Sequence, residues 1–289
     1  MPKPLKKSYP KFSVLMSLYH AEKPRFLEAS LKSLTQSTIP IPEIILMYDG
    51  WIHPDLKDIV EKYKKKLPIR TIAFKRNFGL AKALNFGLHE CKYEYVARFD
   101  TDDLIVPDRF AIQLNTFQAN PYLVVLGSNI EEIDFDKKLY RRVPETLGLI
   151  KRFALFRNPI NHPSVMYKKS SILKVGGYPH VRLFEDYALW VKCMMAHYEI
   201  KNLALPLVKM RGGKDQIIRR HGWRYLIYEY ECARYFKEIH FFSGHDFFRF
   251  ILLRSPSRIL PKRLLSYLYK KELREFIIND DLNFIQKST

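Results

Sequence analysis

Three aspartates, Asp100, Asp102 and Asp103, follow directly on residues 93–99, a segment that is predicted to form a strand. A strand end is rigid, so it can aim several carboxylates at one point. Hard divalent cations prefer oxygen ligands, and Mg²⁺ sites typically combine one or two carboxylates with substrate phosphates. The pattern favours a metal held against a diphosphate. The alternative is a solvated acidic loop that caps a helix starting near Pro107.

A second acidic pair, Glu185 and Asp186, lies in the first turn of a predicted helix, whose apolar seam is formed by Phe184, Ala188, Val191 and Met195. A carboxylate at this position could act as a general base toward an attacking hydroxyl group. Acidic residues in a first turn also simply complement the helix dipole, which is the alternative. His162 lies between the two acidic groups in a loop rich in proline, and a lone histidine is more often a satisfied hydrogen-bonding residue than a catalyst.

Further polar residues follow the other predicted strands. Asp49 comes after residues 43–48 and could accept hydrogen bonds from a base or a ribose, although Asp-Gly is also an ordinary turn. Residues 75–77 precede a helix N-terminus, where free N–H groups favour a phosphate, although a solvated basic loop fits equally well. Four successive strands thus place polar groups at their carboxyl ends.

The elements that must position these residues alternate between strands and helices. Strands are predicted over residues 12–18, 43–48, 69–74 and 93–99, and helices over 24–36, 55–65 and 79–89. In the last of these helices Leu80, Leu84 and Leu88 form an apolar seam at helical spacing. The alternation predicts an α/β fold with a doubly wound, mostly parallel sheet. Ligands of such sheets bind in the crevice beyond the carboxyl ends of the strands.

Composition narrows the class of protein. A hydrophobic fraction of 47% in 289 residues indicates an ordered globular chain, and the net charge of +19 attracts polyanions. Cys91, Cys193 and Cys232 lack the spacing of a zinc site or a disulfide framework. No run has the length of a signal-peptide core or a transmembrane helix, so an intracellular, soluble or surface-bound protein is expected. The missing G-x-G-x-x-G and P-loop patterns disfavour a dinucleotide-binding oxidoreductase and a P-loop NTPase.

Six ordered segments resemble family 2 glycosyltransferases with a GT-A fold, above all bacterial enzymes that build lipopolysaccharide, capsule or exopolysaccharide. The segments cover residues 13–24, 45–50, 77–88, 97–103, 161–166 and 185–190, within a span of about 12–225. The D-x-D-D element alone is weakly specific, whereas the six matches in order are strong.

The resemblance implies a role for each matching residue on the donor side. The uracil and ribose of a nucleotide sugar would be held by Ser17, Tyr19 and Asp49. The ribose and diphosphate would be flanked by Arg76, Asn77 and Lys82. The D-x-D pair that contacts ribose and metal would be Asp100 and Asp102, with Asp103 beside them. The implied cofactors are Mn²⁺ or Mg²⁺ and a nucleotide-sugar donor, most simply a UDP-sugar.

On the acceptor side the resemblance implies that Asp186 is the base and that Glu185 supports acceptor contacts. The family reaction is an inverting single displacement onto a hydroxyl group of a glycan or a lipid-linked oligosaccharide. The chain departs from the family pattern at Tyr48, where a second acidic residue is common. Where many members place a further histidine metal ligand, His221 is a candidate, although Arg219 and Arg220 could instead clamp the diphosphate.

Two regions are expected: a catalytic domain over residues 1–222, with a donor part at about 12–105 and an acceptor part at about 106–222, and a basic, aromatic-rich helical region over 223–289. Its aromatic and aliphatic residues include Phe241, Phe242, Phe247, Phe248, Phe250 and Ile251 to Leu253. A helix opening at Pro261 could lie on anionic lipid. We therefore expect a cytoplasmic protein, peripheral on the inner membrane. The alternative is a helical subdomain that packs on the catalytic domain.

Two other functions compete with sugar transfer. A basic nucleic-acid-binding module would explain the charge, but no nucleic-acid motif is present and clustered aspartates repel phosphate, so no nucleic-acid partner is expected. A sugar-nucleotide pyrophosphorylase-like nucleotidyltransferase would need a glycine-rich basic loop after the first strand, and residues 17–20 do not supply one. The oligomeric state is not indicated.

Overall fold

The computed structural model describes residues 8–133, 139–211 and 222–259. Its centre is a nine-stranded sheet in the order β3-β2-β1-β4-β8-β6-β9-β5, with β7 paired to β6. The strands are β1 (Phe12–Leu18), β2 (Glu43–Tyr48), β3 (Ile69–Ala73), β4 (Tyr95–Arg98), β5 (Leu104–Ile105), β6 (Leu123–Glu132), β7 (Leu139–Arg141), β8 (Met166–Lys168) and β9 (Glu199–Met210).

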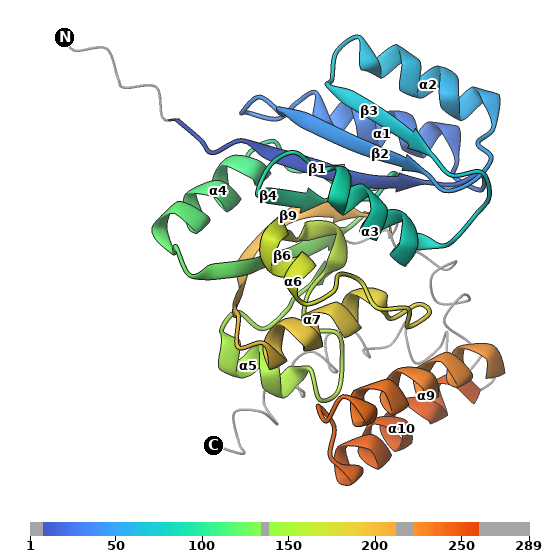
Figure 1. Ribbon diagram of the computed structural model, residues 1–289, viewed down its shortest axis with the longest axis vertical. Helices are drawn as coiled ribbons and strands as arrows, with labels where there is room; N and C mark the ends of the chain where they lie inside the picture. Colours follow the sequence, from blue (N-terminus) through green and yellow to red (C-terminus); the bar gives the residue numbers. More distant parts are fainter. Residues whose placement is uncertain (1–7, 134–138, 212–221, 260–289) are drawn as a thin grey trace.

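Helices cover both faces of this sheet (Figure 1). One face packs against α1 (Pro24–Leu34), α2 (Pro54–Lys64) and α4 (Arg109–Ala119). The other packs against α3 (Leu80–Glu90), α5 (Leu147–Phe153), α6 (Lys169–Lys174) and α7 (Glu185–Met195), and the same core continues into α9 (Trp223–Glu238) and α10 (Gly244–Ile259).

The residues of β1 show why two separate cores form. Successive strand side chains point to opposite faces, so Phe12, Val14 and Met16 join the core with α1, α2 and α4. Leu15 faces the other way and joins the core with α3. A strand buried on both faces is a nearly continuous apolar run, which matches the sequence of β1.

The strand order places the ligand crevice. β1 pairs in parallel with both β2 and β4, and β2 pairs in parallel with β3. The chain therefore builds outward from β1 to β3 and then returns to place β4 on the other side of β1. This reversal leaves a crevice beyond the carboxyl ends of β1 and β4, where the ligands of doubly wound sheets bind.

The predicted elements of the first hundred residues agree with the structure to within two residues at their ends. The strand expected over 93–99 is β4, Tyr95–Arg98, and the helix expected over 24–36 ends at Leu34. The helix expected from Gly79 begins at Leu80, because Gly79 is its N-cap with a φ of 88°. A helix expected near Pro107 is α4, which begins at Arg109.

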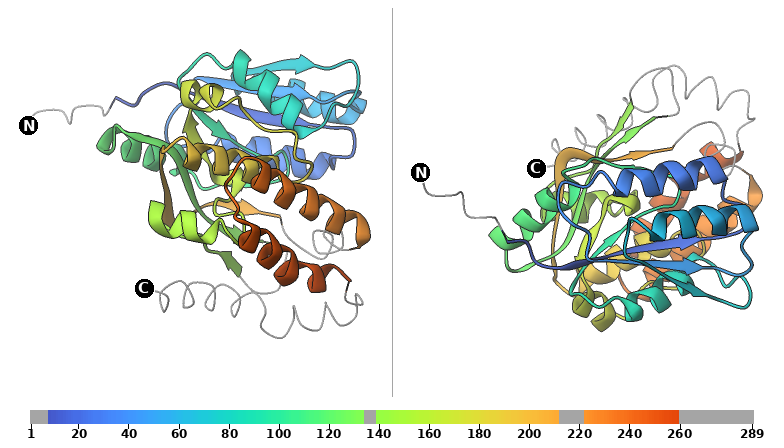
Figure 2. Two further views of the ribbon diagram at one scale, coloured as in Figure 1. Left: turned by 60° about the horizontal axis from the view of Figure 1, so that its bottom comes forward. Right: turned by 90° about the horizontal axis from the view of Figure 1, so that it is seen from above.

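α9 and α10 form a helical pair at the end of the molecule opposite β2 and β3, which Figure 2 shows from two further directions. Phe236 of α9 packs edge-on against Tyr187 of α7, with ring centres 4.8 Å apart. Phe242 and Phe250, two of the aromatic residues of the C-terminal region, are buried in this core. For these two residues the alternative of helical packing is correct. The helix predicted from Pro261 lies outside the described residues.

Within the described ranges, no helix combines the length and the apolar composition that crossing a bilayer requires. The division at residue 222 remains a prediction about folding units. α9 and α10 share one core with α7.

Candidate active site

The acidic cluster lies in the turn that follows β4. Asp100, Asp102 and Asp103 each place a carboxylate oxygen within 4.8 Å of the others. Helix α1 supports the turn, because the Ser30 hydroxyl donates to the Asp100 carbonyl oxygen at 3.1 Å. The loop after β1 adds a fourth acidic residue, Glu22, which accepts a hydrogen bond of 2.6 Å from the buried Thr101 hydroxyl.

The cluster is electrostatically crowded. Burial, with Asp100 and Glu22 adding to it, raises the pKa of Asp102 to about 7. Burial also raises the pKa of Asp103 well above its usual value, although the Arg211 backbone N–H donates to its Oδ1 at 2.9 Å. Like charges held together favour a cation between them. The cluster therefore suits a bound divalent ion better than it suits three ionised carboxylates alone.

Arg98, the last residue of β4, is a buried cation that ion-pairs with Asp100. Burial alone would lower its pKa, but the Asp100 carboxylate outweighs burial and the pKa is raised. Arg109 of α4 lies close behind and donates to the Arg98 carbonyl oxygen at 2.8 Å. Burial, with Arg98 adding to it, lowers the pKa of Arg109 to about 9. Sequence reasoning gave Arg98 no role, although a charged residue inside an apolar strand signals a partner.

The residues present fit a hard divalent cation. The donor set consists of carboxylate oxygens, which Mn²⁺ and Mg²⁺ prefer. Asp103 Oδ2 is buried and has no hydrogen-bond partner among the described residues, so this oxygen is available as a metal ligand. His221, the predicted further ligand, and Arg219 and Arg220 lie outside the described residues.

Asp49 has a structural role that the sequence did not reveal. Its carboxylate accepts hydrogen bonds from the backbone N–H groups of Phe78 at 2.7 Å and Gly79 at 3.0 Å. The anion at the start of α3 is thus Asp49 itself. A side chain at Gly50, whose φ is 93°, would place its Cβ 2.6 Å from the Asn77 backbone nitrogen. Contact of Asp49 with a nucleotide stays a prediction.

The other predicted donor residues lie along the same edge of the sheet. Parallel pairing sets Ser17 of β1 beside Met47 of β2, so Tyr19 lies near Asp49 just beyond the two strand ends. The side-chain amide of Asn77 donates to the Asp49 carbonyl oxygen at 3.2 Å. Two exposed cations, Arg76 and Lys82, lie 4.8 and 5.3 Å from the centre of the Phe78 ring.

The second acidic pair begins α7. Asp186 Oδ2 accepts a hydrogen bond of 2.7 Å from the Asn158 amide, and its Oδ1 accepts one of 2.8 Å from the Tyr187 N–H. Burial, followed by the Asp186 charge, raises the pKa of Glu185 to about 7, while Arg98 opposes this rise. The Arg98 guanidinium therefore acts on both acidic groups. The structure brings together two clusters that are 83 residues apart in the chain, counted from Asp103 to Asp186.

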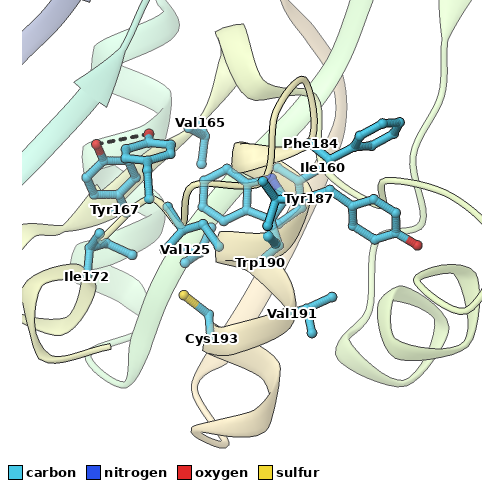
Figure 3. Close-up of a cluster of buried hydrophobic side chains, with 14 of the residues drawn as sticks. Val125, Ile160, Val165, Tyr167, Ile172, Phe184, Tyr187, Trp190, Val191 and Cys193 are labelled. Atoms are coloured by element: carbon cyan, nitrogen blue, oxygen red, sulfur yellow. Dashed lines mark hydrogen bonds between the residues drawn. The ribbon is translucent and has the colours of Figure 1, made fainter. Parts of the chain in front are cut away.

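Neutral hydrogen-bonding groups fill the space around this buried cation. His162 Nε2 lies 3.1 Å from the Tyr178 hydroxyl, which lies 3.3 Å from the Tyr167 hydroxyl. Figure 3 shows the hydroxyl–hydroxyl contact as a dashed line at Tyr167, beside the core formed by Trp190. Burial, with Arg98 adding to it, lowers the pKa of His162 well below its usual value, so His162 is neutral. Sequence reasoning missed Tyr178 altogether.

Comparison with known proteins gives consistent matches. The family model described as "Glycosyl transferase family 2" matches residues 13–176. The amylovoran biosynthesis glycosyltransferase AmsE of Erwinia amylovora is 37% identical over 265 residues, which are 90% of this chain and 98% of that protein. An Escherichia coli "UDP-Gal:alpha-D-GlcNAc-diphosphoundecaprenol beta-1,3-galactosyltransferase" is 36% identical over 271 residues, 93% of this chain and 98% of that protein.

Solved structures show the same fold at lower identity. S. aureus TarS 1-349 in complex with UDP-GlcNAc aligns with a TM-score of 0.59 and 20% identity, covering 77% of this chain and 65% of that one. The mannosyltransferase PcManGT from Pyrobaculum calidifontis, in complex with GDP-Man and Mn²⁺, aligns with a TM-score of 0.60 and 14% identity, covering 86% and 72%. The predicted α/β fold of GT-A type is thereby confirmed.

Proposed function

Because the chain belongs to glycosyl transferase family 2, we propose that it moves a sugar from a UDP-sugar to a hydroxyl group of a glycan or lipid-linked glycan in bacterial surface polysaccharide synthesis. One observation carries the proposal. Two acidic groups with different surroundings, Asp100 to Asp103 and Glu185 with Asp186, lie within the electrostatic reach of one buried cation, Arg98. Sugar transfer needs one acidic group to bind the leaving diphosphate through a cation and another to remove the proton of the acceptor hydroxyl, on opposite sides of the reacting carbon.

On the donor side, Asp100 and Asp102, with Asp103 beside them, would hold Mn²⁺ or Mg²⁺, and this cation would supply the positive charge that stabilises a departing diphosphate. Ser17 and Tyr19 would contact the nucleoside. The exposed cations Arg76 and Lys82 are available to phosphate oxygens at the same edge of the sheet. Asp49 would act mainly by fixing the loop that carries Arg76 and Asn77.

On the acceptor side, Asp186 would be the general base. The hydrogen bonds from Asn158 and from the Tyr187 N–H fix its orientation. Asp186 would take the proton of the acceptor hydroxyl as that oxygen attacks the anomeric carbon. The bond to the diphosphate breaks in the same step, and its electron pair leaves with the diphosphate. A single displacement inverts the anomeric configuration, and Glu185 would support acceptor contacts.

The names of the relatives suggest the first substrates to test. We propose a UDP-hexose donor and a GlcNAc-diphospholipid acceptor, since the Escherichia coli relative is named for UDP-galactose and a diphosphoundecaprenol acceptor. Purified protein with Mn²⁺ should add one hexose to this acceptor, measured by mass spectrometry, and Asp186→Asn should lose at least about 100-fold in rate. If the protein transfers sugar from none of the three donors UDP-galactose, UDP-glucose and UDP-GlcNAc, the proposal is wrong.

A nucleic-acid-binding function is tested by the same protein. Thermal unfolding with UDP and Mn²⁺ should show stabilisation that single-stranded DNA does not give. A larger shift with DNA than with UDP would favour the nucleic-acid-binding alternative.

We also infer that the protein works peripherally on an anionic membrane surface at the cytoplasmic face of the inner membrane. Six large apolar side chains on α9 and α10 are about half exposed or more: Trp223, Ile227, Tyr230, Phe248, Leu252 and Leu253. They make up six of the ten large apolar side chains with this exposure in the described ranges, although each of the two helices has only 16 residues. Exposed aromatic and aliphatic groups on a helical pair suit the headgroup boundary of a bilayer.

The position of this surface supports a lipid-linked acceptor. Trp223 opens α9, and two residues later the Tyr225 ring lies 5.7 Å from the ring of Phe184, which directly precedes Glu185. The apolar surface thus begins beside the proposed acceptor side. A lipid-linked sugar that rises from the headgroup layer would reach Asp186 without leaving the membrane.

Vesicle flotation tests this inference. The full chain should float with vesicles that contain phosphatidylglycerol, and the double variant Phe248→Ser/Leu252→Ser should bind several-fold less. Tyr122→Ser replaces an 88% exposed residue that is distant in sequence from α9 and α10. It is the matched control and should bind vesicles as the unaltered protein does. Equal binding by all three proteins would refute the role of α9 and α10, and a changed oligomeric state of the double variant would indicate a second copy instead of lipid.

A further inference from the structure

Asn85 of α3 holds the backbone of Tyr178, 93 residues later in the chain, with a pair of hydrogen bonds. Its Oδ1 accepts from the Tyr178 N–H at 2.7 Å, and its Nδ2 donates to the Tyr178 carbonyl oxygen at 2.8 Å. The asparagine amide therefore satisfies both backbone polar groups of Tyr178, as the backbone of a paired strand would. No function assigned to the chain so far uses this contact.

The neighbouring backbone is shaped to allow it. Gly177 has a φ of 65°, and a Cβ at this position would lie 2.3 Å from Asn85 Oδ1. Gly176 also has a positive φ, of 82°. The glycine pair thus lets the chain turn and approach the asparagine closely, which no larger residue would allow without a shift.

Tyr178 leads to the second acidic pair by a short, tightly turned path. The Val181 N–H donates to the Pro179 carbonyl oxygen and the Phe184 N–H to the Val181 carbonyl oxygen, both at 2.9 Å. Leu183 has a φ of 64°, a conformation that costs a non-glycine residue about 1 kcal/mol or more and persists only where its surroundings enforce it. The direction in which Glu185 and Asp186 leave this segment depends on where Tyr178 is held.

The other end of the contact is anchored to the donor side. α3 lies tightly on the sheet, because a Cβ at Gly87 would come within 2.5 Å of the Leu15 side chain. The same helix starts at the loop that Asp49 fixes, and Lys82 lies one turn before Asn85. The Tyr178 hydroxyl, in turn, contacts His162 beside Arg98.

We propose that Asn85 and Tyr178 are a positioning pair, which fixes the acceptor-side segment 178–186 against the donor-side helix α3 and so sets the spacing between donor and base. The proposal rests on the proposed function for its kinetic consequence only. Asn85 touches no reacting atom in this scheme. Its effect is on the geometry of the step, where a displacement of about 1 Å can cost as much as 100-fold in rate.

Hydrogen exchange combined with kinetics tests the pair in the full chain. In Asn85→Ala, the amides of Tyr178 and residues 184–187 should exchange at least tenfold faster, while those of Phe78 and Gly79 keep their rates. The kcat for transfer should fall about 10- to 100-fold, and the Kd for UDP with Mn²⁺ should stay within about twofold. Asn85→Asp keeps the acceptor for the Tyr178 N–H, so its exchange rates and kcat should lie between those of Asn85→Ala and those of the unaltered protein.

Two controls separate positioning from stability. Tyr178→Phe retains the backbone contact and should keep the exchange rates of the unaltered protein. Asn129→Ala removes the same kind of double contact elsewhere, to the Ala204 carbonyl oxygen at 2.7 Å and the Val143 N–H at 2.9 Å. It should lower the unfolding temperature without a tenfold loss in kcat when measured below the transition.

Unchanged exchange at residues 178–187 in Asn85→Ala overturns the proposal, and so does an equal loss of kcat and UDP affinity. If the unaltered protein transfers no sugar, the proposed function fails, but the exchange rates still decide whether Asn85 fixes the segment.

Discussion

At the scale of single residues, Arg98 is the feature that organises the site. A buried guanidinium is costly unless its charge is matched, and here Asp100 supplies the direct partner while Glu185 lies within its electrostatic reach. The cation is thus shared between a cluster suited to a metal and a pair suited to proton transfer. This arrangement keeps two groups of carboxylates close without requiring all of them to be neutral.

The first prediction concerns Asp102, whose ionised form is disfavoured in the folded protein. Because burial and neighbouring carboxylates raise its pKa to about 7, Asp102→Ala should unfold at an equal or higher temperature at pH 8 without metal. The same variant should lose most of the Mn²⁺-dependent stabilisation by UDP. Thermal unfolding with and without UDP and Mn²⁺ measures both effects, and a stabilisation by UDP equal to that of the unaltered protein would remove Asp102 from the metal site.

The second prediction concerns Glu185 and pH. Its pKa is about 7 when folded and near 4.5 when unfolded, so the folded state holds the proton more tightly between these values. The contribution of Glu185 to stability is therefore most favourable below pH 4.5 and is lost as the pH rises to 7. Glu185→Gln should gain stability over the unaltered protein at pH 8 but not at pH 4.5. Urea unfolding at the two pH values checks this, and a gain confined to low pH would reverse the assignment.

At the scale of elements, the parallel register of β1, β2 and β4 gathers the predicted donor-binding residues, and close backbone contacts then fix the loops. The clearest case is the approach of the turn after β2 to the loop before α3. There Gly50 allows the Asn77 backbone to come near while Asp49 accepts from the start of the helix. The loop that carries Arg76 is therefore held from two sides.

The third prediction follows from this approach. Gly50→Ala should destabilise the protein by about 1–3 kcal/mol, because the residue has a positive φ and its Cβ meets the backbone of Asn77. UDP affinity should fall with it, since the loop before α3 must shift. Gly148→Ala in α5 is the control, where a Cβ meets nothing and helix propensity favours alanine by about 0.5–1 kcal/mol. Calorimetry on both variants tests the contrast, and similar unfolding temperatures would contradict it.

At the scale of the whole molecule, a buried ion network joins α9 and α10 and holds them to the rest of the protein. Glu229 of α9 accepts from Arg254 Nε at 2.7 Å and from Arg258 Nη2 at 2.8 Å. Arg254 also donates to the Phe156 carbonyl oxygen at 3.1 Å, in the loop after α5. The proposed membrane surface is thereby fixed relative to the site.

The fourth prediction concerns this network. Although burial alone would raise the pKa of Glu229, Arg254 and Arg258 together hold it below its usual value. The stability that Glu229 contributes is present above pH 4.5 and is lost as the pH falls through its lowered pKa. Glu229→Gln should cost about 3–5 kcal/mol at pH 7, since it removes the buried charge that faces two largely buried arginines.

Limited proteolysis checks this result, with cleavage in α9 or α10 expected first. Arg234→Gln is the matched control, because its pair with Glu238 is exposed and such pairs contribute at most about 1 kcal/mol. Equal resistance of all three proteins to protease would show that the network does not hold the helices in place.

The sequence by itself determined the elements of the first half and the chemistry of the acidic residues. Nearly continuous buried runs produced β1, β2 and β4 within two residues of their predicted ends, because these local patterns are set by neighbours in the chain. The GT-A fold and the family followed from the ordered segments. The roles of single residues such as Ser17 and Asp186 stay predictions.

Only the tertiary structure decided which distant residues meet. No local pattern links Arg98 to Glu185, Asn85 to Tyr178, or Glu229 to Arg254, because each pair is set by how helices pack on the sheet after the elements form. Packing also sorted the aromatic residues of the C-terminal region, burying Phe250 and leaving Phe248 70% exposed. Residue type specifies what a group can do, while long-range contacts determine its partners, charge state and exposure.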